Sequence, residues 1–281
     1  MLMAVGACST MPPEAGKSPL TPAKMSRGTC VVDVLFVRFP LGDAESNGSL
    51  WSEIDEQHFP DDVRRQLAYY GFRVGWVGGQ MPLALARMLE LNDETPPTGQ
   101  ANQVDLDVLE SAPRVVRRHI QLPPGQRREI LTSGIYDELP VLVRESDRLG
   151  GRSYAKAQGA LGIAAHPQPD GRVRLDLVPE LHYGEAGQRF VGDQGVFRLD
   201  TRRPRRDFGD LAFSATLAAG DMLIVSCLPN RPGSLGHYFF THECDGKAEQ
   251  KLLVIRVSQT QHDRLFEQRE WLAFHSPQRD P

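Results

Sequence analysis

Two groups of acidic residues around a histidine are the residues of this sequence best suited to chemistry. The first is Glu53, Asp55, Glu56 and His58, and the second is Glu180, His182 and Glu185. Carboxylates beside an imidazole can act together as general acid and general base. Alternation along a predicted strand, however, places Glu180 and His182 on one polar face with Arg172 and Arg174. Because cross-strand charge pairing accounts for such a face, we favour that interpretation and predict no catalytic residues.

Two cysteines and two histidines form a second candidate for chemistry. Cys227 and Cys244 flank the segment 228–243, and a disulfide between them would tie its ends together in an oxidising compartment. The alternative is that both are free thiols, packed as small apolar groups. With His237 and His242 they offer four zinc ligands, but their spacing matches no standard zinc pattern. We therefore predict no metal site and no cofactor.

The chain has one concentrated run of basic residues. Its arginines are Arg202, Arg203, Arg205 and Arg206. Such a run can contact lipid headgroups or an acidic partner, and the alternative is a solvated loop. The formal net charge of the whole chain is −4 and 24% of its residues are charged, so its overall field does not favour nucleic acid. We predict no nucleic-acid partner.

The first part of the ordered chain has the pattern of a small α/β domain, over residues 30–92. Residues 30–40 carry apolar side chains on both faces, which is typical of a strand buried on both sides. Residues 61–71 have helical spacing, begin with acidic residues and end at a glycine. A second strand over 72–78 follows, and Pro82 suits the first turn of a second helix.

Turn signals predict where the chain breaks. Gly42-Asp43 and Asn47-Gly48 are expected to interrupt regular structure after the first strand. The polar residues 93–110 predict a linker. The turn at 122–125 separates strand-like segments over 115–121 and 127–131, so we expect these two segments to form a hairpin.

A larger, mainly antiparallel β domain is predicted over residues 111–257, which makes the fold class α+β. Its clearest feature is a long hairpin over 157–185, closed by a Pro-Asp-Gly turn. Pro179 cannot donate a ladder hydrogen bond, so we expect a bulge or a sheet edge there. Further strands are expected, among others, at 222–225, 238–241 and 251–257. The remaining residues, 258–281, form a polar tail.

The N-terminus resembles the end of a bacterial lipoprotein signal peptide. Val5-Gly6-Ala7-Cys8 fits the pattern in which the cysteine receives a lipid, but no Lys or Arg precedes Cys8 and the apolar stretch is short. Residues 9–29 contain four prolines and suit a tether, so that 1–29 would be a signal remnant with its tether. The resemblance implies anchoring at the outer membrane on its periplasmic side, because Ser9 follows the cysteine. The alternative is an uncleaved N-terminus on a cytosolic protein.

The order of strand motifs in the C-terminal half resembles the secretin domain of bacterial type II and type III secretion systems. The matching motifs are Gly159-Ala160-Leu161, Asp170 to Leu177, Gly220 to Val225, Ser234 to Phe239 and Gln250 to Ile255. Ser226-Cys227 replaces the paired glycines of that family, and the chain before residue 140 has no room for its ring-building domains. The resemblance therefore implies a secretin-like domain on a lipid-anchored stalk rather than a complete pore.

These observations lead to one main hypothesis and two alternatives. The main hypothesis is a non-catalytic, lipid-anchored envelope protein that contacts other envelope or secretion-system proteins, with the oligomeric state left open. One alternative is an envelope enzyme that uses one of the acidic groups. The other is a soluble module that binds an extended peptide at the sheet edge near Pro179.

Overall fold

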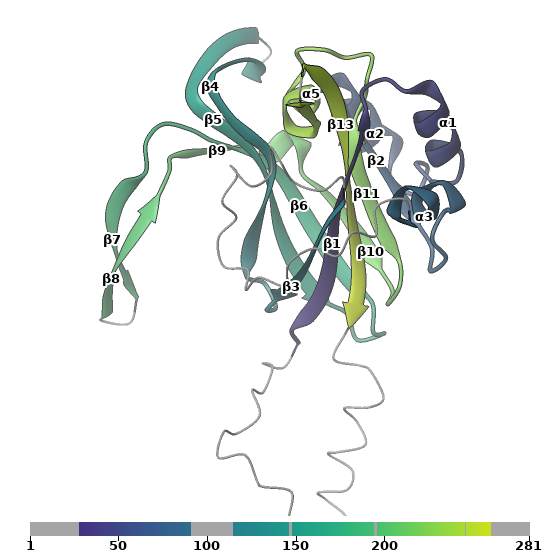
Figure 1. Cartoon of the computed structure of the whole chain (residues 1–281). Helices are drawn as coiled ribbons and strands as arrows, with labels where there is room; N and C mark the ends of the chain where they lie inside the picture. The colour runs from purple at the N-terminus through teal and green to yellow at the C-terminus, as the bar shows by residue number, and fades with distance from the viewer. Residues whose placement is uncertain (1–27, 91–114, 146–147, 194–195, 245, 260–281) are drawn as a thin grey trace, which may run out of the picture.

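The computed structural model describes residues 28–90, 115–145, 148–193, 196–244 and 246–259 (Figure 1). Cys8, the tether up to residue 27, the linker 93–110 and the tail from residue 260 lie outside the described residues. Antiparallel strands dominate the structure and a few short helices accompany them, which confirms the α+β class. No helix in the described ranges is both long enough and apolar enough to cross a membrane.

One antiparallel sheet, sheet A, combines strands from both ends of the chain. Its order is β2-β11-β13-β1-β3, and β12 also pairs with β13. The strands are β1 (Cys30–Pro40), β2 (Phe72–Val77), β3 (Val115–Leu122), β11 (Met222–Cys227), β12 (Thr241–Cys244) and β13 (Lys247–Gln259). Because β1 pairs with β13 and β2 with β11, the predicted boundary after residue 92 does not separate two sheets.

A second antiparallel sheet, sheet B, packs against sheet A. Its order is β10-β6-β5-β4, and β9 also pairs with β6. The strands are β4 (Arg127–Glu145), β5 (Arg148–Pro167), β6 (Val173–His182), β9 (Arg205–Asp207) and β10 (Phe213–Leu217). The pairing of β5 with β6 confirms the predicted long hairpin, and Gly171 has a φ of +84° in its turn. A separate hairpin of β7 (Gly187–Asp193) and β8 (Val196–Arg202) stands apart from the two sheets (Figure 1).

Pro179 neither bulges nor lies at an edge, so that prediction was wrong. The β5–β6 register continues through it without a shift. On the other side of β6, the Pro179 carbonyl accepts a hydrogen bond from the Phe208 N–H at 2.9 Å. The N–H and C=O of a strand residue point to the same side of the strand. The N–H that proline lacks would therefore point to the gap between β9 and β10, where neither strand pairs with β6. No ladder hydrogen bond is lost, and the strand has neighbours on both sides here.

The predicted hairpin between residues 115–121 and 127–131 is also wrong. β3 pairs with β1 in sheet A, whereas β4 pairs with β5 in sheet B. The intervening turn docks on β5, where the Gly125 N–H donates to the Ala165 carbonyl at 3.0 Å. The turn therefore carries the chain from one sheet to the other.

Helices cover the face of sheet A that points away from sheet B (Figure 1). α1 (Ala44–Ser52) and α3 (Leu83–Glu90) bury Leu50, Trp51 and Leu85 against that face. The break predicted at Gly42-Asp43 is confirmed, because a turn with Gly42 at a φ of +74° separates β1 from α1, but the break predicted at Asn47-Gly48 was wrong, since these residues lie inside α1. The Asp43 carboxylate accepts a hydrogen bond from the Ser46 N–H at 3.0 Å, and this N-cap offsets the low helix propensity of Gly48.

Two more helices pack at the interface between the sheets. α2 (Asp61–Tyr69) confirms the helix predicted over residues 61–71, and Gly71 follows it with a φ of +82°. α5 (Leu235–Phe240) begins at Ser234, whose hydroxyl accepts from the His237 N–H at 3.2 Å. The strand predicted at 238–241 was wrong, because this cap starts a helix whose end residues, Phe239 and Phe240, are fully buried.

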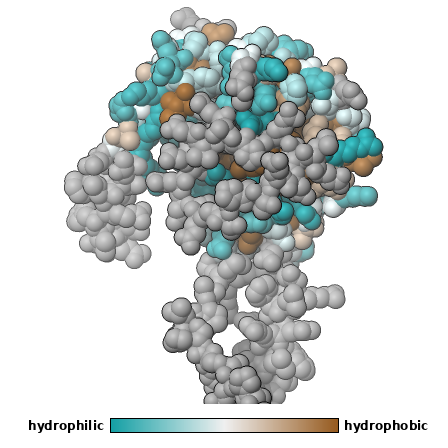
Figure 2. Space-filling model, in the orientation of Figure 1, coloured by the Kyte–Doolittle hydropathy of each residue, from teal (hydrophilic) through white to brown (hydrophobic). Residues whose placement is uncertain are grey.

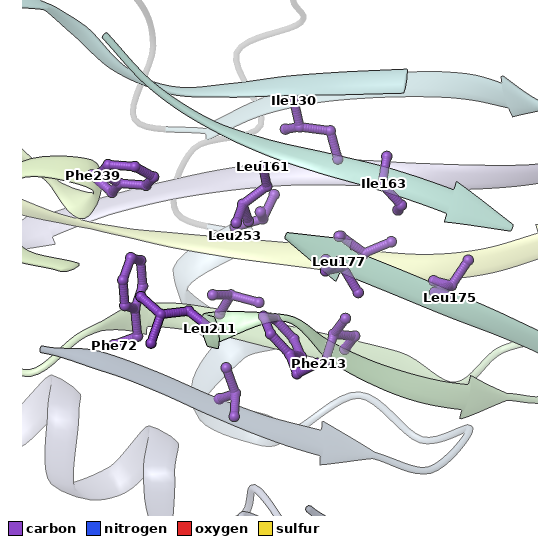
Figure 3. Packing of buried hydrophobic residues seen from close by; sticks show 14 of the residues in the cluster. Phe72, Ile130, Leu161, Ile163, Leu175, Leu177, Leu211, Phe213, Phe239 and Leu253 are labelled. Carbon is purple, nitrogen blue, oxygen red and sulfur yellow. The ribbon is translucent and has the colours of Figure 1, made fainter. Parts of the chain in front are cut away.

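The main hydrophobic core lies between sheets A and B (Figure 3). Leu161 of β5 and Leu253 of β13 contribute to it from opposite sheets, and Leu175 and Leu177 of β6 extend it. Alternation along β6 therefore sends its leucines inward and its polar residues to the outer face of sheet B.

Candidate functional site

A cluster of charged residues lies on the outer face of sheet B, and we call it the Glu180 cluster. It consists of Arg127, Glu129, Glu180, His182, Arg205 and Asp207. Strands β4, β6 and β9 each supply two of these residues. The register places Glu180 opposite Asp207 and His182 opposite Arg205. Leu181 points into the core, so the side chains on either side of it share the outer face.

Small residues on β5 make room for this cluster. Glu180 is fully buried even though it lies on the outer face of the sheet. The residue directly opposite it on β5 is Ala160, and the next residue on the same face is Gly162. A Cβ atom at Gly162 would overlap Glu180 Oε1 and would lie 2.5 Å from Arg127 Nε. The space that a larger side chain would fill is occupied by the Glu180–Arg127 pair.

Arginines take one oxygen of each glutamate in the cluster. Arg127 Nη2 pairs with Glu180 Oε1, and Arg205 Nη1 lies 3.2 Å from Glu129 Oε1. Asp207 joins both arginines, with its Oδ1 3.6 Å from Arg127 Nη2 and 3.3 Å from Arg205 Nε. These ion pairs fix the orientation of both glutamates.

The second oxygens of the two glutamates converge on His182. Its Nε2 lies 3.7 Å from Glu129 Oε2 and 3.7 Å from Glu180 Oε2. Both distances exceed that of a hydrogen bond. Among the described residues, neither His182 Nε2 nor Glu180 Oε2 has a hydrogen-bond partner, and both atoms are buried. One ligand atom from each of these three side chains lies within 4.8 Å of the other two, and this is the one such group of His, Cys, Asp or Glu in the described part of the chain.

The surroundings of His182 favour its neutral form. Burial is the main cause that lowers its pKa below the ordinary value, and the charges of Arg203, Arg205 and Arg127 lower it further. The charge of Glu129 acts in the opposite direction but does not outweigh them. Burial likewise lowers the pKa of Arg127. A neutral imidazole between two carboxylates can accept a proton or bind a cation.

The predicted partners of Glu180 and His182 were wrong. Arg172 pairs with Asp170, and Arg174 pairs with Asp176, each within the hairpin itself. Glu185 lies outside the cluster and pairs with Lys156, which lowers the pKa of its carboxyl. The ion pairing that we predicted for this face is present, but the arginines come from β4 and β9.

Arginines of the basic run make contacts within the protein, rather than lying in a solvated loop. Arg205 is in the Glu180 cluster. Arg203 donates to the Gly184 carbonyl at 2.9 Å, and Arg206 donates to the Tyr154 hydroxyl at 2.9 Å. Arg202 is exposed at the end of β8. The contact of this run with headgroups or an acidic partner stays a prediction.

The first acidic group is dispersed. Glu53 accepts hydrogen bonds from the N–H groups of Leu83 and Ala84 at the start of α3, at 3.0 and 3.4 Å. Asp55 accepts from the Gln57 N–H at 2.8 Å, and Glu56 pairs with Arg73 through two contacts of 2.6 and 3.0 Å. The His58 ring stacks on Trp76 with a centroid distance of 4.9 Å. Each residue thus has a separate structural role.

The cysteines that the structure describes are free thiols. Cys227 is buried, its Sγ lies 3.7 Å from the Phe240 carbonyl oxygen, and burial raises its pKa to about 12. Cys227 thus fits the free-thiol alternative, and the side chain of Cys244, the other half of the possible disulfide, lies outside the description. Cys30 is also buried and free, with its pKa raised to about 11 by burial.

Lys251 is another buried charged residue, at the interface between the sheets. Its Nζ donates a hydrogen bond to the Thr132 carbonyl, which lies where the β4–β5 register shifts between Leu131 and Ile135. Burial lowers its pKa to about 8, and the charge of Arg38 contributes in the same direction. This ammonium group sits on a strand of sheet A and contacts the backbone of sheet B.

Sequence reasoning missed Glu129 and Arg127. Both lie on β4, more than fifty positions before Glu180, and only the register of β4 against β5 brings them to the cluster. The available signal was the alternation of small residues along β5, at Ala160, Gly162 and Ala164. A central strand with small residues on one face leaves space for long side chains from its neighbours.

Comparison with known proteins adds little to this geometry. No family model matches the chain, and no curated protein matches it. Among solved structures, the chain is similar to the InvG secretin domain β-barrel from the Salmonella SPI-1 injectisome NC-base. The identity is 11% and the TM-score is 0.19, over 90% of this chain and 69% of that chain. At this TM-score the likeness supports no conclusion about fold or function.

Proposed function

We propose that this chain is a non-catalytic binding protein of the bacterial cell envelope, with a secretin-like β part that joins other proteins in a secretion or surface assembly. A lipid on Cys8 would hold it at the outer membrane, with residues 9–29 as the tether. The support for this address is the lipoprotein-like start and the order of secretin-like motifs in the sequence.

The observation that carries the binding role is the free edge of β4. Sheet B ends at β4, which among the described residues has β5 on one side and no strand on the other. β4 has 19 residues, whereas β6 has 10, and in Figure 1 the far ends of β4 and β5 rise beyond the rest of the sheet. An unpaired edge offers backbone donors and acceptors to an added strand.

Two exposed apolar side chains lie along this edge strand. Ile135 is 54% exposed and Leu142 is 60% exposed. On the face of the molecule that Figure 2 shows, the described residues are mainly hydrophilic, with small separate hydrophobic patches. A partner strand that pairs with β4 would gain backbone hydrogen bonds and cover these side chains.

Cross-linking in the native envelope, followed by mass spectrometry, tests the binding role. The double variant Ile135→Lys/Leu142→Lys should lose the cross-linked partners of the native chain. The matched control is Tyr69→Lys/Leu83→Lys, because these residues are similarly exposed, at 53% and 58%, on two helices. Partners that both double variants retain would show that β4 is not the binding edge.

The anchor needs a separate experiment. Palmitate labelling and detergent partitioning of the native gene product should both depend on Cys8 and fail in a Cys8→Ser variant. An unlabelled protein that fractionates entirely with the soluble cytosol would overturn the envelope address.

The convergence of Glu129, Glu180 and His182 favours one second candidate, an acid–base enzyme. In this case an activity found by screening hydrolytic substrates should fall at least about 100-fold in His182→Gln. The fold of that variant would be checked by circular dichroism. Activity that survives in a folded His182→Gln protein would exclude this site as the catalytic centre.

A further inference from the structure

The Glu180 cluster has three ligand atoms that point toward one another and make no bond to one another. Glu129 and Glu180 each use Oε1 for an arginine, whereas each Oε2 lies 3.7 Å from His182 Nε2. Glu180 is fully buried, and its Oε2 has no hydrogen-bond partner among the described residues. A buried carboxylate oxygen without a donor is costly, so the geometry calls for a group that it can bind.

The spacing of these atoms suits a metal ion. Zinc binds imidazole nitrogen at about 2.0–2.1 Å and carboxylate oxygen at about 2.0–2.2 Å, so tetrahedral ligands lie about 3.4 Å apart. The two distances of 3.7 Å from His182 Nε2 exceed that separation by a few tenths of an ångström. Small side-chain rotations would close the difference, because no hydrogen bond between the three groups has to be broken.

We propose that Glu129, Glu180 and His182 bind one divalent transition-metal ion, through the two Oε2 atoms and the imidazole Nε2. Two carboxylate oxygens with one imidazole nitrogen suit ions such as Zn²⁺ or Mn²⁺. The Glu129 side chain is 35% exposed, so the ion can enter from that side and keep water in its remaining coordination positions.

The arginines of the cluster orient the ligands. Arg127 holds Glu180 and Arg205 holds Glu129, each through the oxygen that faces away from His182. Such outer contacts fix the geometry of metal ligands and are part of most metal sites. They also place positive charge near the ion, which Asp207 balances in part. We therefore expect a weaker site than an all-cysteine structural zinc site.

Calorimetric titration of Zn²⁺ into the chelator-treated full chain is the first test. The native chain should bind one ion at this site, and Glu129→Gln and His182→Gln should each weaken that binding at least tenfold. Glu56→Gln and His58→Gln are the matched controls, since they make the same changes in the dispersed acidic group, and they should bind as the native chain does. Absence of Zn²⁺ binding to the native chain, or unchanged binding in both Glu129→Gln and His182→Gln, would overturn the proposal.

A second measurement does not depend on the folding of any variant. X-ray absorption at the zinc edge of the native complex should show oxygen and nitrogen neighbours, with one imidazole and no sulfur. Sulfur in the first shell would place the ion at a cysteine and overturn the proposal. The site is independent of the β4 edge, so Ile135→Lys/Leu142→Lys should retain Zn²⁺ binding even if it loses its partners.

Discussion

Glu180 and Lys251 are both buried charged side chains, but the protein stabilises them in different ways. Glu180, on the outer face of sheet B, has the guanidinium of Arg127 against one of its oxygens. Lys251, between the sheets, has the carbonyl of Thr132 as its hydrogen-bond acceptor, and the nearby charge of Arg38 is of the same sign. The carboxylate is held by a counter-ion, whereas the ammonium is held by a peptide dipole.

The difference follows from the strands that surround each residue. At Glu180 the small residues of β5 let an arginine from β4 cross the sheet and reach the carboxylate. At Lys251 the carbonyl of Thr132, at the register shift in β4, accepts the hydrogen bond, and among the described residues no acidic side chain forms an ion pair with the ammonium. Burial, with a smaller contribution from the charge of Arg38, therefore lowers the pKa of this ammonium to about 8, and the opposing effect of Cys227 does not offset it.

The largest effect should come from removing the counter-ion of Glu180. Arg127→Met leaves a fully buried carboxylate without a cation, which should lower the free energy of unfolding by about 3–5 kcal/mol. Arg73→Met is the matched control, because its partner Glu56 is partly exposed and such pairs contribute about 0–1 kcal/mol. Urea unfolding of both variants measures the two losses. Equal losses would mean that burial does not distinguish the two ion pairs.

The pH dependence of stability should reveal Lys251. Its pKa is about 8 in the folded protein, against 10.5 for an ordinary lysine, so between these values the unfolded chain binds more protons. Stability then rises with pH across this window, and the total gain is about 3 kcal/mol. The Lys251→Met variant lacks this gain. The raised pKa values of the buried thiols Cys30 and Cys227 make stability fall as the pH rises above 9. The quantity to compare is therefore the difference in free energy of unfolding between the native chain and the variant at each pH.

Urea unfolding from pH 7.5 to 10.5 provides that difference. Parallel stability curves for the native chain and Lys251→Met would contradict the assignment of a low pKa to Lys251.

Local patterns in the sequence were enough to predict several elements of the fold. Period-two alternation predicted the β5–β6 hairpin, and helical spacing with acidic residues and a terminal glycine predicted α2. Local signals failed at two places, for different reasons. At α1 the Asp43 cap outweighed Gly48, and at 122–125 a turn that suits a hairpin instead joins two sheets. Which strands pair across such a turn depends on long-range packing that alternation does not encode.

The site was predicted only in part, for the same reason. Alternation correctly put Glu180 and His182 on the polar face of one strand, but a strand pattern does not say which neighbour lies opposite. Arg127 and Glu129 reach them through β5, and Arg205 through β9. In the other acidic group, closeness in sequence was misleading, because Glu53, Asp55 and Glu56 each bond to a different nearby group.

Filling the space on β5 should have the next largest effect. In Gly162→Ala the new methyl group meets Glu180 Oε1 and both the Nε and Nη2 atoms of Arg127, so the buried pair must move. Overpacking of this kind costs about 1–3 kcal/mol. Gly48→Ala is the control, since nothing lies within 4 Å of its Cβ position in α1, and it should stabilise by about 0.5–1 kcal/mol. Thermal unfolding would report opposite shifts; a neutral Gly162→Ala would mean that the space on β5 does not hold the pair in place.

The smallest effect is expected at the exposed side of the same cluster. Glu129 is 35% exposed and its partner Arg205 is 37% exposed, so Glu129→Gln in the metal-free protein should change the free energy of unfolding by only about 0–1 kcal/mol. Water solvates both groups in the folded protein, and Arg205 keeps Asp207 as a partner at 3.3 Å. Adding Zn²⁺ should then stabilise the native chain and leave Glu129→Gln almost unchanged, because an ion that binds only the folded state raises its stability. If Glu129→Gln in the metal-free protein lowered the free energy of unfolding about as much as Arg127→Met does, the cluster would be one cooperative unit. The exposure of each charged group would then not determine its contribution to stability.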